Sequence, residues 1–239
     1  MQIVVVHGSA RKGNTYQAAQ KVLSHMRTLG ELSVQEYYLP QDLPHFCMGC
    51  MACFEKGEDA CPHAKYTLPL RDAMEAADAL IFTTPVYAMR ESGGMKAFLD
   101  HFAFQFMVHR PRKSMFSKKA LVLCTTAGGG MGAAIKAVRT SLVYWGVNRV
   151  YTQGLALRAA SWDDLSPKRR ARLEKRLTYR AEQLFRDVLS KKNHIAYPIL
   201  HITYLFAKLM LQGKLFGISS DSIDSRYWRE QGYFASRPF

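Results

Sequence analysis

The sequence is poor in acidic side chains, and it contains no long uncharged apolar segment. Its 19 Asp and Glu residues stand against 33 Lys and Arg, which gives a formal net charge of +14. This balance favours anionic partners: a phosphate-bearing cosubstrate, an acidic protein, an anionic membrane surface or nucleic acid. The most apolar segment begins at Ile195 and meets Lys208 after about 13 residues, whereas a membrane-spanning helix needs roughly 20. We therefore expect no spanning helix.

Signatures of nucleic-acid binding and of secretion are also missing. Because no nucleic-acid-binding fold motif is visible, nucleic acid is the anionic partner that we expect least. Met1 leads directly into an apolar run, without a basic leader or a small-residue cleavage site, so we expect a cytoplasmic protein. The chain has enough apolar side chains to form a packed interior, since 48% of its residues are hydrophobic and 13 Phe and 12 Tyr are among them. Disorder is thereby excluded.

The first loop has the composition of a phosphate cradle. The apolar run Ile3–Val6 breaks into a loop that carries Ser9, Arg11, Gly13, Asn14 and Thr15, and a helical pattern follows. The hydroxyl, amide and cationic groups can converge with backbone N–H groups on one anion, toward which the helix directs its positive end. Neither G-x-G-x-x-G nor G-x-x-x-x-G-K-[ST] occurs, and the predicted guest is a phosphomonoester. The alternative is an ordinary capped connection between strand and helix.

Apolar runs alternate with helical patterns along the chain. We expect strands at 3–6, 32–39, 79–83, 120–124 and 150–157, and helices within 15–29, 73–77, 95–106, 135–146 and 173–188. This rhythm predicts an α/β fold, a doubly wound five-stranded parallel sheet of flavodoxin-like order 2-1-3-4-5. In that topology the loops after strands one, three and four meet at one crevice. The predicted domain covers 1–192, with a cysteine-rich insertion at about 40–69, and an apolar helical extension covers 193–239.

Three motifs carry a resemblance to a known family. They are Gly8-Ser9-x-Arg11-x-Gly13-Asn14-Thr15, then Thr84-Pro85-Val86-Tyr87 followed by Gly93-x-Met95-Lys96-Ala97-Phe98-Leu99-Asp100, and Thr126-Ala127-Gly128-Gly129. In order and spacing, residues 1 to about 157 resemble the NAD(P)H-dependent FMN reductase and iron–sulfur flavoprotein branch of the flavodoxin superfamily. Ala10 departs from that pattern, which commonly has a proline there.

The resemblance implies a role for each motif. The first would hold the FMN phosphate, the second would flank the isoalloxazine, and the third would lie on the other side of the flavin. It also implies an FMN-dependent NAD(P)H oxidoreductase that passes electrons to a quinone, flavin or nitro compound. An FMN electron carrier and a redox-sensing protein are the alternatives. No general acid or base is predicted, since the flavin carries the chemistry, and we expect a homodimer or tetramer.

The cysteine-rich insertion carries the pattern Cys47-x2-Cys50-x2-Cys53-x7-Cys61-Pro62. It resembles the compact motif of iron–sulfur flavoproteins, which implies a [4Fe-4S] cluster that passes electrons to FMN. Four thiolates also suit zinc, and free thiols in a structural loop are the third alternative. Cys124 lies within a predicted strand and is expected to be buried.

The C-terminal extension carries an apolar helical pattern. Leu200, Tyr204, Ala207, Leu211 and Leu215 share one face of it. We expect this helix to pack over the flavin domain or across a subunit interface; the alternative is an interfacial helix on an anionic membrane, beside the basic residues of 168–192. For the aromatic segment 221–234 the sequence predicts no role.

Overall fold

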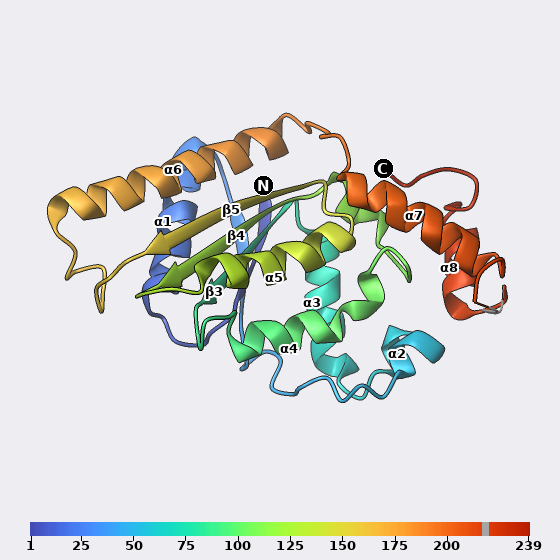
Figure 1. Cartoon of the computed structure of the whole chain (residues 1–239). Helices are drawn as coiled ribbons and strands as arrows, with labels where there is room; N and C mark the ends of the chain where they lie inside the picture. Colours follow the sequence, from blue (N-terminus) through green and yellow to red (C-terminus); the bar gives the residue numbers. More distant parts are fainter. Residues whose placement is uncertain (217–219) are drawn as a thin grey trace.

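The structure is a computed structural model that describes residues 1–216 and 220–239, and it is built around one parallel sheet (Figure 1). The five strands are β1 (Gln2–His7), β2 (Ser33–Tyr38), β3 (Ala79–Pro85), β4 (Lys119–Thr126) and β5 (Arg149–Ala156). All neighbouring strands are parallel, in the order β2-β1-β3-β4-β5. The predicted flavodoxin-like order is therefore confirmed.

Helices cover both faces of the sheet. Successive strand residues point to opposite sides, and apolar residues lie on both sides. The helices are α1 (Asn14–Leu29), α2 (Ala52–Glu55), α3 (Ala64–Ala76), α4 (Gly93–His101), α5 (Met131–Tyr144), α6 (Pro167–Leu189), α7 (Pro198–Leu211) and α8 (Ile223–Glu230). Ile3 and Val5 of β1 pack in one core with α1 and α6, whereas Val4 and Val6 belong to the core on the other face. The apolar run of β1 is thus buried on both sides, as parallel strands in such folds usually are.

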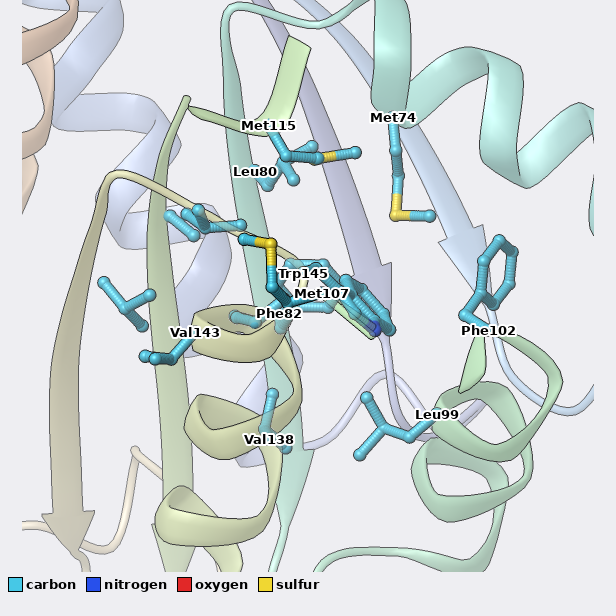
Figure 2. Packing of buried hydrophobic residues seen from close by; sticks show 14 of the residues in the cluster. Met74, Leu80, Phe82, Leu99, Phe102, Met107, Met115, Val138, Val143 and Trp145 are labelled. Carbon is cyan, nitrogen blue, oxygen red and sulfur yellow. The ribbon is translucent and has the colours of Figure 1, made fainter. Parts of the chain in front are cut away.

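The second core also takes in the C-terminal extension. Figure 2 shows part of this core, in which Phe82 of β3 lies close to Trp145 at the end of α5, with ring centroids 6.5 Å apart. Leu200 and Tyr204 of α7 and Trp228 of α8 belong to the same cluster. The face of α7 that was predicted to be buried therefore packs over the sheet domain.

Helices α3 and α4 differ from their predicted bounds. Helix α3 begins at Ala64 and contains Pro69, so the irregular part of the cysteine-rich insertion ends before the proline that was expected to bound it. Proline removes one hydrogen bond of the helix and crowds the carbonyl group four residues earlier. Leu70 and Met74 are fully buried, and this burial stabilises the helix against that cost. Helix α4 ends at His101, and a short 3-10 turn follows at Ala103–Gln105.

The outer strand β5 has its backbone groups engaged by side chains. Arg176 and Arg169 of α6 donate to the carbonyl oxygens of Gly154 and Ala156, at 3.0 and 2.9 Å. At the beginning of the strand, the Val150 amide donates to the Tyr197 hydroxyl at 3.0 Å. Side chains from α6 and from the start of α7 therefore cover parts of this edge.

Candidate functional site

A pocket of about 420 Å3 opens at the carboxyl ends of the strands. Ten of the 13 residues predicted to bind the cofactor line it: Ser9, Arg11, Gly13, Asn14, Thr15, Pro85, Val86, Tyr87, Thr126 and Ala127. They come from the loops after β1, β3 and β4. The three loops therefore meet as the strand order requires.

The first loop and the start of α1 bring positive charge and backbone N–H groups to the pocket. The Ser9 Oγ accepts from the Arg11 amide at 3.2 Å, and the Asn14 side chain donates to the Ala160 carbonyl at 2.9 Å. Helix α1 begins at Asn14 and has no acidic residue in its first turn. Arg11 and Lys12 line the pocket, and no Asp or Glu does so among the residues that the structure describes. Such a site is suited to an anion.

Thr84 shapes the pocket without lining it. Its side chain is fully buried, and its Oγ1 accepts from the Ser92 amide at 3.0 Å and donates to the Pro85 carbonyl at 3.1 Å. Ser92 in turn donates through its Oγ to the Gly8 carbonyl. A Cβ atom on Gly8 would lie only 2.7 Å from both the Ser92 Oγ and the Thr83 carbonyl oxygen. This close packing joins the loop after β1 to the loop after β3.

A tight turn at Tyr87–Arg90 forms one wall of the pocket. Tyr87 and Arg90 exchange two backbone hydrogen bonds of 3.0 Å, and Ala88 and Met89 between them have positive φ values of 47° and 66°. Non-glycine residues rarely adopt this conformation, and it costs free energy. Tyr87 is half-exposed, and its hydroxyl lies 3.4 Å from the Ser9 Oγ. The turn therefore carries an aromatic ring to the rim of the loop after β1.

Gly128 and Gly129 lie beside the pocket but outside its lining. The Thr126 Oγ1 accepts from the Gly128 amide at 3.1 Å and donates to the Gly129 carbonyl at 2.8 Å, which fixes the loop after β4. The next residue, Gly130, packs against the backbone of Met89. The segments that follow the Thr84–Tyr87 and Thr126–Gly129 motifs thus contact each other, and the lack of a side chain at Gly130 permits this close approach.

The structure adds residues that the motifs did not predict. Leu157, Ala159, Ala160 and Ser161 line the pocket from the loop after β5. Only the position of this loop could have indicated them, because the parallel strands β4 and β5 end at the same edge of the sheet.

His7 is a further lining residue that the motifs left out. It is buried between the Thr83 Oγ1 at 3.1 Å and the Glu36 Oε2 at 2.7 Å, and it stacks on Tyr38 with ring centroids 4.8 Å apart. Burial lowers the pKa of His7, although Glu36 opposes this shift. Burial therefore disfavours the charged form of this imidazole.

The four clustered cysteines line a second, smaller cavity of about 40 Å3. Cys47 and Cys50 are exposed, Cys53 and Cys61 are half-buried, and all four are free thiols. Burial raises the pKa of Cys53 and of Cys61, and the neighbouring cysteines raise both further. Within residues 1–216 and 220–239, no three His, Cys, Asp or Glu side chains converge closely enough to hold a metal ion. The donors still share one cavity, and four thiolates are the donor set of iron–sulfur and zinc sites.

The C-terminal segment holds the cysteine loop in place through Arg110. This side chain is almost fully buried; it donates to the Asp224 carboxylate of α8, to the Cys53 carbonyl and, at 3.3 Å, to the Glu58 Oε2. The Trp228 Nε1 also donates to the His109 carbonyl at 2.7 Å. The segment 221–234, to which the sequence assigned no role, is therefore a structural partner of the cysteine loop.

Comparisons with known proteins agree with this geometry. The family model described as NADPH-dependent FMN reductase matches residues 1–161. An iron–sulfur flavoprotein of Archaeoglobus fulgidus is 23% identical over 237 residues, which cover 98% of this chain and 100% of that protein. An NADPH azoreductase of a Bacillus species is 27% identical over 146 residues, 59% of this chain and 68% of that protein.

Solved structures show the same fold at low identity. An oxidoreductase from Corynebacterium diphtheriae matches with a TM-score of 0.59 and 19% identity, over 80% of this chain and 99% of that one. An NAD(P)H:quinone oxidoreductase from Methanothermobacter marburgensis matches with a TM-score of 0.58 and 14% identity, over 81% and 99% of the two chains. Both support the flavodoxin-like architecture.

Proposed function

Because the chain belongs to the NADPH-dependent FMN reductase family, we propose that its 420 Å3 pocket binds FMN and that the protein oxidises NAD(P)H on behalf of a small electron acceptor. The family consists of FMN-dependent oxidoreductases. The observation that carries the proposal for this site is the convergence of three predicted loops on one pocket lined by cations and by the start of a helix.

Each part of the pocket has a chemical task in this proposal. Arg11 and the N–H groups at the start of α1 would hold the phosphate, because both favour an anion. Pro85 and Tyr87 would form one wall of the flavin slot, and Thr126 and Ala127 another. When bound, FMN supplies the redox chemistry. The protein contributes binding, orientation and the exclusion of competing reactions.

The electron acceptor in this proposal is a small molecule such as a quinone, a flavin or a nitro compound. The names of two relatives, an NADPH azoreductase and an NAD(P)H:quinone oxidoreductase, support this class. Steady-state oxidation of NADPH and NADH by the FMN-loaded protein, with one acceptor of each kind, tests the proposal. Turnover with at least one acceptor is expected. Negligible turnover with all of them would contradict the enzyme and favour an electron carrier or a redox sensor.

Arg11→Ala is expected to weaken FMN binding by about 10- to 100-fold, because a charge-assisted hydrogen bond contributes about 1.5–3 kcal/mol. Fluorescence titration of the apoprotein with FMN measures the change. Arg27→Ala is the matched control, since Arg27 lies in the last turn of α1, at the end away from the pocket, and it should bind FMN like the wild type. Unchanged affinity in Arg11→Ala would count directly against the phosphate assignment.

We further propose that Cys47, Cys50, Cys53 and Cys61 hold a [4Fe-4S] cluster. Their thiols line one cavity, and two relatives are named iron–sulfur flavoproteins. Helix α4 connects the two sites, because Gly94 packs near the carbonyl of Gly8 and His101 lines the cysteine cavity. Nine helical residues correspond to roughly 13 Å, so the proposed flavin and cluster sites lie near opposite ends of one short helix.

Anaerobically purified protein is expected to contain about four iron and four sulfide per chain. Cys50→Ala should lose this iron and the broad visible absorption but keep its FMN. Cys124→Ala is the control, because Cys124 is buried in β4, outside the cavity, and this variant should keep both cofactors. Flavin absorption without iron in the wild type would rule out the cluster, and zinc in its place would favour the alternative metal.

A further inference from the structure

Helix α7 is apolar on two opposite sides, although only one side packs into the protein. Leu200, Tyr204, Ala207 and Leu211 are buried at three- and four-residue steps. On the other side, Ile202 and Leu205 are 67% and 57% exposed, and Ile199 and Phe206 are exposed beside them. A surface helix normally presents polar residues to water. A contiguous apolar patch of this kind marks a contact with another surface.

The patch extends beyond the helix at both ends. Ile195, just before α7, is 94% exposed. Phe216, after the helix, is 78% exposed, and its ring centroid lies 6.0 Å from that of Phe206. We call the side chains of Ile195, Ile199, Ile202, Leu205, Phe206 and Phe216 the α7 face.

The surroundings of the α7 face carry positive charge. The sequence has no Asp or Glu between Asp187 and Asp221, but it has Lys191, Lys192, Lys208 and Lys214 there. Arg237 lies along one side of α7, 3.1 Å from the His201 ring and 5.9 Å from the centre of the Tyr204 ring. The flank of the helix is therefore cationic.

The amino end of α7 adjoins a basic groove. The Tyr197 hydroxyl bonds the Val150 amide at 3.0 Å, next to Arg149. Arg149 lines a groove of about 650 Å3 together with Arg186 and Lys192. The only acidic residue that lines the groove among those described, Asp187, already accepts from the Tyr151 hydroxyl and pairs with His194. Cations therefore lie at one end of the α7 face as well as along its flank.

We propose that the α7 face binds the surface of an anionic lipid bilayer. Its apolar side chains enter the boundary between headgroups and acyl chains, and the lysine and arginine side chains around it contact the lipid phosphates. The 14 residues of α7 span about 21 Å, and none of the helices in the described parts of the chain is both long and apolar enough to cross a membrane. The helix therefore lies in the plane of the surface.

The position of α7 is compatible with a working pocket. Tyr197 and Val150 place α7 at the amino end of β5, whereas the pocket lies at the carboxyl ends of the strands. Figure 1 shows α7 away from the arrowheads of β4 and β5. A symmetric contact between two copies of the α7 face would instead place one cationic surrounding against another. Charge complementarity thus favours an anionic bilayer over a second copy.

Sedimentation of the FMN-loaded full chain with lipid vesicles tests the proposal. Binding is expected with equal parts of phosphatidylglycerol and phosphatidylcholine at low salt, and little binding with phosphatidylcholine alone. Leu205→Glu should weaken binding about tenfold or more, because it replaces an apolar side chain that would enter the bilayer by a negative charge. Leu29→Glu is the matched control, since Leu29 is an exposed leucine at the end of α1, and it should bind like the wild type.

Flavin content and circular dichroism establish that each variant is folded. Both leucines are exposed, so neither substitution is expected to disturb the core. The proposal is overturned if the wild type stays in solution with anionic vesicles, or if Leu205→Glu binds them as well as the wild type does. It is also overturned if vesicles are not bound and Leu205→Glu turns an oligomer into monomers in analytical ultracentrifugation. That result would assign the α7 face to a second copy of the chain.

Discussion

Arg110→Met is expected to lower the free energy of unfolding by about 3 kcal/mol, since breaking a buried ion pair costs about 3–5 kcal/mol. The Arg110 side chain is only 3% exposed and pairs with Asp224 and Glu58. Methionine fills a similar volume but leaves both carboxylates with fewer partners. The low end of the range applies because His109 still bonds Asp224, and Arg112 still pairs with Glu58. Urea denaturation measures the change.

The same substitution should loosen two segments far apart in the sequence. Amide hydrogen exchange is expected to rise in α8 and in the cysteine loop, because Arg110 joins Asp224 to the Cys53 carbonyl. Arg229→Met is the control: Arg229 is an exposed residue of α8 whose side chain bonds the Ser220 carbonyl, and a change within about 0.5 kcal/mol is expected. A loss below 1 kcal/mol in Arg110→Met would show that the ion pairs are not needed for this packing.

Gly130→Ala is expected to cost about 2–4 kcal/mol of stability and to weaken FMN binding as well. Gly130 has a φ of +81°, and a Cβ atom there would lie 2.6 Å from the Cα of Met89. The left-handed conformation costs alanine about 1 kcal/mol, and the overlap with a neighbouring backbone adds about 1–3 kcal/mol. The displaced backbone belongs to the turn that carries Tyr87, so the wall of the pocket moves.

Gly132→Ala gives a control of opposite sign. Gly132 lies two residues further on, within α5, and a Cβ atom there would meet nothing within 4 Å. Alanine is the better helix former by roughly 0.5–1 kcal/mol, so this variant should be slightly more stable and should bind FMN normally. Thermal denaturation and FMN titration of both variants measure the contrast. Equal stability and equal FMN affinity in the two glycine variants would contradict the prediction. The close contact between Gly130 and Met89 would then not be needed to hold the Tyr87 turn in place.

The sheet could be predicted from the sequence because its signals are local. Ile3–Val6 and Ala120–Cys124 are short apolar runs, and each is buried on both faces of the sheet. The alternation of strands with helices then leaves few topologies, and the parallel order 2-1-3-4-5 is one of the common ones. Pro69 shows the limit of local rules, since long-range burial of Leu70 and Met74 keeps the helix intact through the proline.

The pocket could be predicted only in part, for a similar reason. Ser9, Arg11 and Tyr87 belong to motifs that can be read from neighbouring residues, and they do line the pocket. The Ala160 carbonyl accepts a hydrogen bond from the Asn14 side chain, 146 residues away. No pattern of side chains in the sequence predicts such a contact. The contact of Arg110 with Asp224 likewise joins residues 114 positions apart. Contacts of this kind become visible only when the chain is folded.

The arginines that cover β5 limit how the molecule can assemble. An outer strand with free backbone groups is a template for another strand, and sheets that extend in this way form fibres. Arg176 and Arg169 donate hydrogen bonds to carbonyl oxygens of β5, and the Tyr197 hydroxyl accepts one from the Val150 amide. A second chain would have to displace these side chains before its own strand could pair. Any homodimer or tetramer is therefore expected to form through side-chain surfaces, and the sheet should end at β5 in every copy.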